Sequence, residues 1–185
     1  MTTSEKTDEQ IAKMVQDGDL QSFGVLVDRY ESKIARYAQR FLFRGDDVKD
    51  VVQDVFLKAY TNIQSFNLNR RFSPWIYRIA HNEFINAIKK RGKEPFSIFD
   101  VDTIFPHLTV SDESLDKDFD KKTVIEELNN SFKKLDTKHR EILTLYYYEE
   151  MGYKEIADIL EIPISTVGVR ILRAKRELKK ELEKK

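Results

Sequence analysis

Apolar residues recur every three or four positions over most of both ends of this chain, and this spacing restricts the fold to helices. Residues 19–41 illustrate the pattern with Phe23, Leu26, Val27, Tyr30, Ile34, Tyr37 and Phe41. The spacing puts these side chains on one face of an α-helix, whereas a half-buried strand needs strict alternation. The 185 residues include only 6 Gly and 4 Pro, too few for the many turns of a sandwich or barrel. The sequence therefore predicts an all-α protein.

Several helix ends are also marked in the sequence. Thr7 with Gln10 forms a capping-box pattern. The pair Ser73-Pro74 predicts a helix start with Ser as the cap and Pro in the first turn, where its missing N–H costs nothing. From such signals we expect helices over about 7–18, 19–45, 46–63, 73–91, 124–132, 136–146, 153–160 and 164–185.

The charge is zero overall but unevenly distributed. Residues 1–92 hold 15 basic and 12 acidic side chains, net +3, and residues 122–185 hold 14 and 12, net +2. Residues 93–121 hold 3 basic and 8 acidic side chains, net −5, with two prolines and no sustained helical period. We therefore expect two small helical domains, 1–92 and 122–185, joined by an acidic linker, 93–121. We also hypothesise that this acidic linker occupies basic surfaces on the two domains and competes there with their ligands.

A helix-turn-helix is the strongest pattern of the C-terminal part. A short helical stretch, 153–160, is followed by a tight turn at Pro163 and a longer helix whose sequence is net +5 from Ile164 onward. Apolar residues stand where the two helices must cross. An inert basic helix would explain the charge but not the preceding helix and turn, so DNA binding is favoured. The candidate contacts lie on the outer side of the second helix: Ser165, Thr166, Val169, Arg170, Arg173 and Lys175.

Aromatic and basic residues alternate at the start of the fourth predicted helix, and residues 70–91 are net +5. Aromatic rings stack on unpaired bases while Arg and Lys neutralise the backbone, so this composition suits single-stranded DNA. The alternative is that Trp75 and Tyr77 are core aromatics and that the basic side chains form a solvated face.

The start of the third predicted helix has the opposite sign. Asp46, Asp47, Asp50 and Asp54 surround one lysine. Favourable interaction with the helix dipole explains Asp46 and Asp47, but it fades within one turn and does not account for Asp54. An acidic protein-docking face is the alternative.

In this order and spacing, the three patterns resemble the bacterial sigma factors of the extracytoplasmic-function (ECF) group of the sigma-70 family. The resemblance covers about residues 10–92 and 122–183. It is based on five stretches: 46–56, 72–82, 135–136, 153–160 and 162–170. It implies a non-enzymatic subunit that gives core RNA polymerase its promoter specificity, with a region 2-like domain before the linker and a region 4-like domain after it.

The resemblance also implies roles for single residues. Binding to the clamp helices of the largest polymerase subunit falls to Asp50, Gln53, Asp54 and Phe56. Opening of the minus-10 element falls to the loop 64–71 and the helix after it, with the candidates Arg70, Arg71, Trp75, Tyr77, Arg78, Asn82, Asn86, Lys89 and Lys90. The helix-turn-helix residues named above would read the minus-35 element, and the linker would follow the RNA exit path.

Two positions depart from the family pattern. Ile164 stands where the family often has Gly, and Gly168 stands where a basic or polar residue is usual. A glycine inside a helix costs about 0.5–1 kcal/mol and removes a contact, or it allows the backbone to approach the groove closely. Minus-35 recognition is therefore expected to be weaker than usual or to differ in sequence.

The expected partners are core RNA polymerase, promoter DNA as duplex and as melted single strand, and an anti-sigma factor. With no Cys and three scattered His, the chain lacks a thiolate metal site and a His cluster at metal-ligand spacing. We expect no catalytic residues, metal or cofactor. No signal-peptide core or membrane-spanning stretch is present, so a cytoplasmic protein without membrane contact of its own is expected.

One alternative is a polymerase-independent helix-turn-helix regulator. Such a protein would bind duplex DNA tightly by itself. The acidic helix start and the aromatic, basic stretch of residues 70–91 would then have no explanation.

Overall fold

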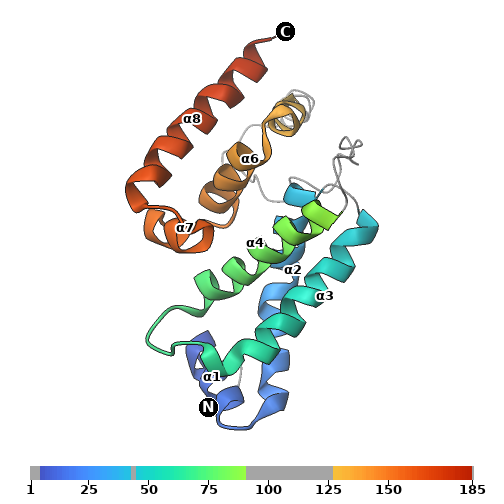
Figure 1. The fold of residues 1–185 in the computed structure, drawn as a ribbon, viewed down its shortest axis with the longest axis vertical. Coiled ribbons are helices and arrows are strands. Elements are labelled where there is room, and N and C mark those ends of the chain that lie inside the picture. The colour runs from blue at the N-terminus through green and yellow to red at the C-terminus, as the bar shows by residue number, and fades with distance from the viewer. Residues whose placement is uncertain (1–4, 43–44, 91–126, 185) are drawn as a thin grey trace, which may run out of the picture.

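The computed structural model describes residues 5–42, 45–90 and 127–184, and within these ranges every regular element is helical (Figure 1). The all-α prediction is confirmed. The predicted linker, 93–121, lies outside the described residues. The elements of the N-terminal domain are α1 (Asp8–Gln16), the short turn η2 (Leu20–Ser22), α2 (Phe23–Leu42), α3 (Gly45–Asn62), the turn η3 (Ile63–Ser65) and α4 (Phe72–Lys90).

The C-terminal domain is also built from helices. After a helical stretch at 127–134 come α6 (Thr137–Leu143), a π-helical turn η5 (Thr144–Tyr148), α7 (Tyr153–Leu160) and α8 (Ile164–Glu183). The helix α6 packs on α8, and α7 packs on α8 to form the predicted helix-turn-helix. Ile156, Ile159, Val167 and Ile171 are buried at that crossing.

The apolar faces predicted from the sequence make up the core of the N-terminal domain. In this domain α2, α3 and α4 pack against one another and α1 packs on α2. Side chains at helical spacing on these elements are fully or almost fully buried, including Leu26, Ile34, Tyr37, Val55, Ile76 and Phe84. Burial of large apolar side chains contributes about 1.5–3 kcal/mol each, so this shared core holds the three helices in fixed positions.

Local capping signals were correct where the cap is close in sequence. Thr7 Oγ1 accepts from the Gln10 amide, and Gln10 Oε1 accepts from the Thr7 amide at 3.0 Å. Asp136 Oδ1 accepts from the amide of His139 at 2.8 Å and starts α6. Gly18, just after α1, has a φ of +107°, a conformation that glycine adopts without strain.

Three predicted helix starts differ from the structure. Asp19 caps the short turn η2, and α2 begins later. The helix α3 begins at Gly45, one residue before the predicted start. The helix α4 begins at Phe72, before the predicted serine cap, and the Phe72 amide donates to Glu9 Oε1 of α1 at 2.9 Å.

The two domains are in contact in this structure. The helix α4 of the N-terminal domain packs against α7 of the C-terminal domain, and α2 packs against α6 (Figure 1). The DNA-facing candidates of α4 therefore lie next to the first helix of the helix-turn-helix.

Candidate nucleic-acid interface

A strip of polar and basic side chains runs along α4. Arg78, Asn82, Asn86, Lys89 and Lys90 are all exposed, and their spacing puts them on one side of the helix. Two further predicted residues, Arg70 and Arg71, are exposed in the loop just before α4. The structure thus brings seven of the predicted minus-10 residues onto a continuous surface.

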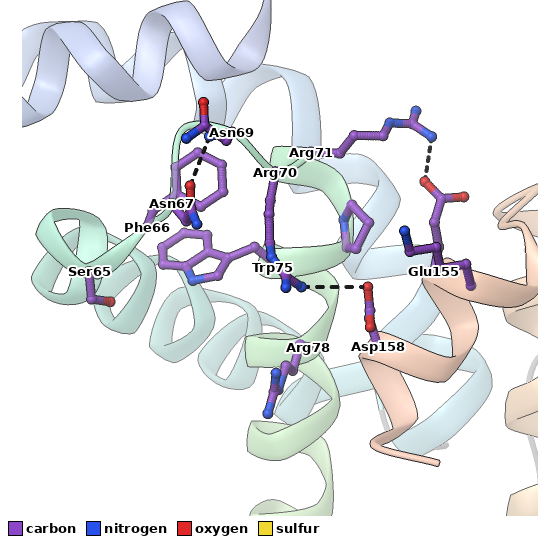
Figure 2. Close-up of a pocket in the computed structure, with 12 residues that line it drawn as sticks. Ser65, Phe66, Asn67, Asn69, Arg70, Arg71, Trp75, Arg78, Glu155 and Asp158 are labelled. Atoms are coloured by element: carbon purple, nitrogen blue, oxygen red, sulfur yellow. Dashed lines mark hydrogen bonds and ion pairs between the residues drawn. The ribbon is translucent and has the colours of Figure 1, made fainter. Parts of the chain in front are cut away.

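A pocket of about 740 Å³ opens at the N-terminal end of this strip, between the loop before α4 and α7 (Figure 2). The Trp75 ring lines it and packs on the rings of Phe66 and Phe72, with centroids 5.2 and 5.3 Å away. An aromatic surface edged by arginines is suited to an unpaired base and its phosphate. Further lining side chains are Ser65, Asn67, Asn69, Arg70, Arg71 and Arg78.

Two amide side chains of the pocket, Asn67 and Asn69, are not among the residues predicted from the sequence. Asn67 Oδ1 accepts from the Asn69 amide at 2.9 Å, a local turn that fixes the loop beside the pocket (Figure 2). An Asn followed two residues later by another Asn in a predicted loop is the signal that would have found them, because Asn side chains bond to nearby backbone groups.

The helix α1 braces this loop from behind. Gln16 Nε2 donates to the carbonyl oxygens of Ile63 and Phe66 at 2.6 and 2.9 Å, and Gln64 Nε2 donates to the Gln16 carbonyl at 3.1 Å. Together with the bond from Phe72 to Glu9, these contacts hold both ends of the pocket loop on α1.

Tyr77 behaves differently from the other predicted minus-10 residues. Its side chain is 1% exposed and its ring lies 5.6 Å from that of Tyr37, centroid to centroid. Its hydroxyl donates to Glu149, and burial raises its pKa well above the ordinary value. In this structure Tyr77 is a core aromatic with no surface to offer DNA.

The predicted polymerase-binding residues lie on α3. Asp50, Gln53 and Asp54 are exposed, but Phe56 is only 8% exposed and packs inward. Beside them the structure exposes Leu57, at 60%, which the sequence pattern did not single out. The outer face of α3 therefore combines carboxylates with one large apolar side chain.

The second helix of the helix-turn-helix presents most of its predicted contacts. Ser165, Val169 and Arg173 are exposed, whereas Thr166 and Arg170 are half-buried. Leu172 and Arg176 are exposed as well and fall on the same side by helical geometry. Neither is among the contacts predicted from the sequence.

Lys175 lies on the flank of α8, over two tyrosine rings. Its Nζ is 5.9 Å from the Tyr146 centroid and 5.1 Å from that of Tyr147. Its hydrogen bond with Tyr147 raises the pKa of Lys175. Cation–π contacts of this kind keep the ammonium group near the protein surface.

Gly168 is explained by a neighbour within the domain. A Cβ at this position would lie 3.3 Å from Cε2 of Tyr153, closer than ordinary contact. The glycine lets the Tyr153 ring lie against α8, so close backbone approach here serves the crossing of α7 and α8.

Both halves of the chain are similar to known proteins. Residues 26–94 match the family model of sigma-70 region 2, and residues 125–178 match that of sigma-70 region 4. The chain is 37% identical to the ECF RNA polymerase sigma factor SigW of Bacillus subtilis, over 92% of this chain and 94% of that protein. It is 35% identical to the ECF RNA polymerase sigma-E factor of Escherichia coli strain K12, over 93% of this chain and 92% of the relative.

A solved structure supports the same relationship. The chain superposes on CnrH in its complex with the cytosolic domain of CnrY, with a TM-score of 0.71 and 26% identity, covering 96% of this chain and 98% of CnrH. In the part of the chain that the structure describes, no helix is both long and apolar enough to cross a membrane. The chain belongs to the ECF RNA polymerase sigma factors, the family of subunits that direct transcription initiation.

Proposed function

We propose that this sigma factor divides promoter recognition among three surfaces. The α4 strip and its pocket bind the melted minus-10 strand, the outer side of α8 reads the minus-35 duplex, and the outer face of α3 binds core polymerase. The domain boundaries 1–92 and 122–185, with 93–121 as linker, belong to this proposal. The observation that carries it is the exposed basic strip of α4, which ends beside the Trp75 ring and the arginines of the loop before the helix.

The proposed minus-10 site combines the two features that single strands require. Arg70, Arg71 and Arg78 supply charge for phosphates, and Trp75 supplies a ring for stacking, worth about 1–3 kcal/mol per base. Asn67 and Asn69 add amides that can hydrogen-bond the edge of an unpaired base, so the pocket can select as well as hold.

The proposed duplex contacts follow helix-turn-helix geometry. The exposed Ser165 and Val169 lie in the first two turns of α8, the part of a recognition helix that reaches base edges, and Arg173 follows on the same side one turn later. An arginine there can bind a guanine through two hydrogen bonds, and Arg176 one turn later suits a phosphate.

The proposed polymerase contact uses the exposed carboxylates of α3, with the clamp helices of the largest subunit as the partner. We also propose an anti-sigma partner, because a sigma factor of similar fold, RpoE from Bartonella quintana, was solved in complex with the anti-sigma factor NepR. A cytoplasmic protein without catalytic residues or a cofactor completes the proposal.

Run-off transcription with purified bacterial core polymerase and a promoter library tests this function. The full chain should support initiation, and permanganate footprinting should detect unpaired thymines at the minus-10 element. Replacing Arg70, Arg71 and Arg78 together by Ala should remove that melting. The matched control replaces three exposed lysines outside α3, α4 and α8, Lys13, Lys134 and Lys138, and should initiate normally.

Two outcomes contradict the proposal. Tight polymerase-free binding to duplex DNA with no initiation from any promoter would favour the polymerase-independent regulator. Normal melting by the triple arginine variant would remove the α4 strip from the minus-10 site.

A further inference from the structure

Each arginine of the proposed strand-binding site meets a carboxylate of the other domain. Arg71 pairs with Glu155, and Arg70 Nη1 lies 4.0 Å from Asp158 Oδ2 (Figure 2). Arg78 pairs with Glu161, the C-cap of α7. The three acidic residues are three positions apart, so they lie along one side of α7.

The acidic side of α7 is held in position by local structure. Glu155 also uses Oε2 to accept the Gly152 amide at 2.8 Å, which caps α7 and directs the other oxygen to Arg71. Glu161 has a φ of +53° at the C-cap, in the left-handed region that ends the helix. The carboxylates are therefore presented by an ordered helix.

Buried bonds fix how the two domains meet. Glu141 Oε1 of α6 accepts from the Tyr37 hydroxyl at 2.7 Å and lies 2.5 Å from His81 Nδ1 of α4. Tyr77 of α4 donates to Glu149. Exposed ion pairs contribute little to stability, so these buried contacts set the register in which the arginines and carboxylates face one another.

We propose that α7 is a built-in competitor for the melted DNA strand. While the two domains are in contact, Glu155, Asp158 and Glu161 bind the arginines that would otherwise bind phosphates. The proposal rests on the proposed role of Arg70, Arg71 and Arg78 at the minus-10 element. The free protein then binds single strands weakly, and separation of α7 from α4 exposes the site.

The physical basis is that carboxylate and phosphate oxygens make the same charge-assisted hydrogen bonds with guanidinium groups. One arginine cannot satisfy both partners with the same donors. The apparent dissociation constant for the strand rises in inverse proportion to the fraction of molecules in which α7 is displaced. Neutral side chains on α7 should therefore tighten binding, by roughly tenfold for three weak pairs.

A neutralised variant of the full chain tests this. Glu155→Gln, Asp158→Asn and Glu161→Gln are combined, and fluorescence anisotropy measures binding of a labelled single strand carrying a minus-10 sequence selected by the run-off library. The matched control makes the same charge change on α8, at Glu177, Glu181 and Glu183, which pair with lysines of their own helix. Roughly tenfold tighter binding by the first variant, beyond any change in the control, is expected.

A second measurement keeps Glu155, Asp158 and Glu161 unchanged and follows the distance between the two domains. The chain contains no Cys, so Lys13→Cys with Lys180→Cys gives two defined sites for a fluorescent donor and acceptor, one in each domain. Saturating single strand should lower energy transfer, because the strand and α7 cannot both occupy the arginines. Unchanged transfer on strand binding, or equal affinity of the neutralised variant and its control, would overturn the proposal.

The two hypotheses fail in distinguishable ways. If the arginine variant loses promoter melting with polymerase but the α7 variant binds strands no better than its control, the proposed function stands and the competitor is wrong. If the arginine variant melts promoters normally, the proposed function of α4 is wrong, and the competitor falls with it.

Discussion

Tyr77 donates a hydrogen bond from its phenol to a carboxylate oxygen of Glu149, and this bond joins the middle of α4 to the C-terminal domain. Burial raises the pKa of both groups. The other carboxylate oxygen of Glu149 makes no hydrogen bond within the described residues. Burial therefore favours a protonated Glu149, whereas the bond from Tyr77 favours the carboxylate. The net rise in the pKa of Glu149 makes the contact between the two domains sensitive to pH.

The first prediction concerns Glu149→Gln. A carboxyl whose pKa is raised in the folded state stabilises that state in its protonated form. This stabilisation is complete below the ordinary pKa of 4.5 and is lost as the pH rises through the raised value. The melting temperature of the wild type should therefore fall relative to that of the variant as the pH rises from about 4.5 to 7. A constant difference in melting temperature between the two proteins over that pH range would contradict the prediction.

Charge reversal on α3 is the second prediction. Asp50→Lys with Asp54→Lys should weaken binding to core polymerase by at least about a hundredfold, because like charges across an interface cost several kcal/mol. Circular dichroism should be unchanged, since both side chains are exposed. The matched control, Asp17→Lys with Glu183→Lys, makes the same charge change elsewhere and should bind core normally. Core affinity that survives the α3 change would show that this face is not the contact.

A third prediction separates two cations of α8. Arg173→Ala should weaken holoenzyme binding to a minus-35 promoter by about 1–3 kcal/mol, because its exposed guanidinium faces outward where bases are read. Lys175→Ala should cost less, because its ammonium group lies over the rings of Tyr146 and Tyr147. Quantitative footprinting of the minus-35 region measures both, and equal losses would count against this distinction.

The fourth prediction is a double-mutant cycle at the crossing of α7 and α8. Gly168→Ala should raise helix propensity by about 0.5–1 kcal/mol but push its Cβ against the Tyr153 ring. Stability should therefore change little in the wild type and rise in a Tyr153→Ala background. Denaturant unfolding measures the four proteins, and equal effects in both backgrounds would mean that Tyr153 is not the obstacle.

Local signals in the sequence predicted local structure well. The Thr7 cap is recognisable in the sequence because it bonds an amide only three residues away. The sequence places the start of α4 two residues late, because Glu9 accepts from the Phe72 amide across 63 positions of sequence. No pattern around Ser73 reports on such a distant partner.

Contacts between domains were beyond the sequence pattern for the same reason. A helical period identifies the buried side of α7 but not which helix faces its exposed side, so Glu155 and Asp158 were not linked to the arginines. Competition with DNA was instead assigned to the acidic linker, which lies outside the described residues. The sequence leaves Tyr77 open between core and DNA contact, and in this structure its side chain is 1% exposed because the C-terminal domain, through Glu149, covers it.

The brace formed by α1 has a consequence for how the minus-10 region is dissected. The region 2 family match begins at residue 26, whereas Glu9 and Gln16 hold the loop that carries the pocket. A fragment starting at residue 26 would keep all the proposed strand contacts and lose the helix that sets their positions. Weak strand binding by such a fragment would reflect a missing scaffold, so the smallest independently working unit begins before the recognisable family segment.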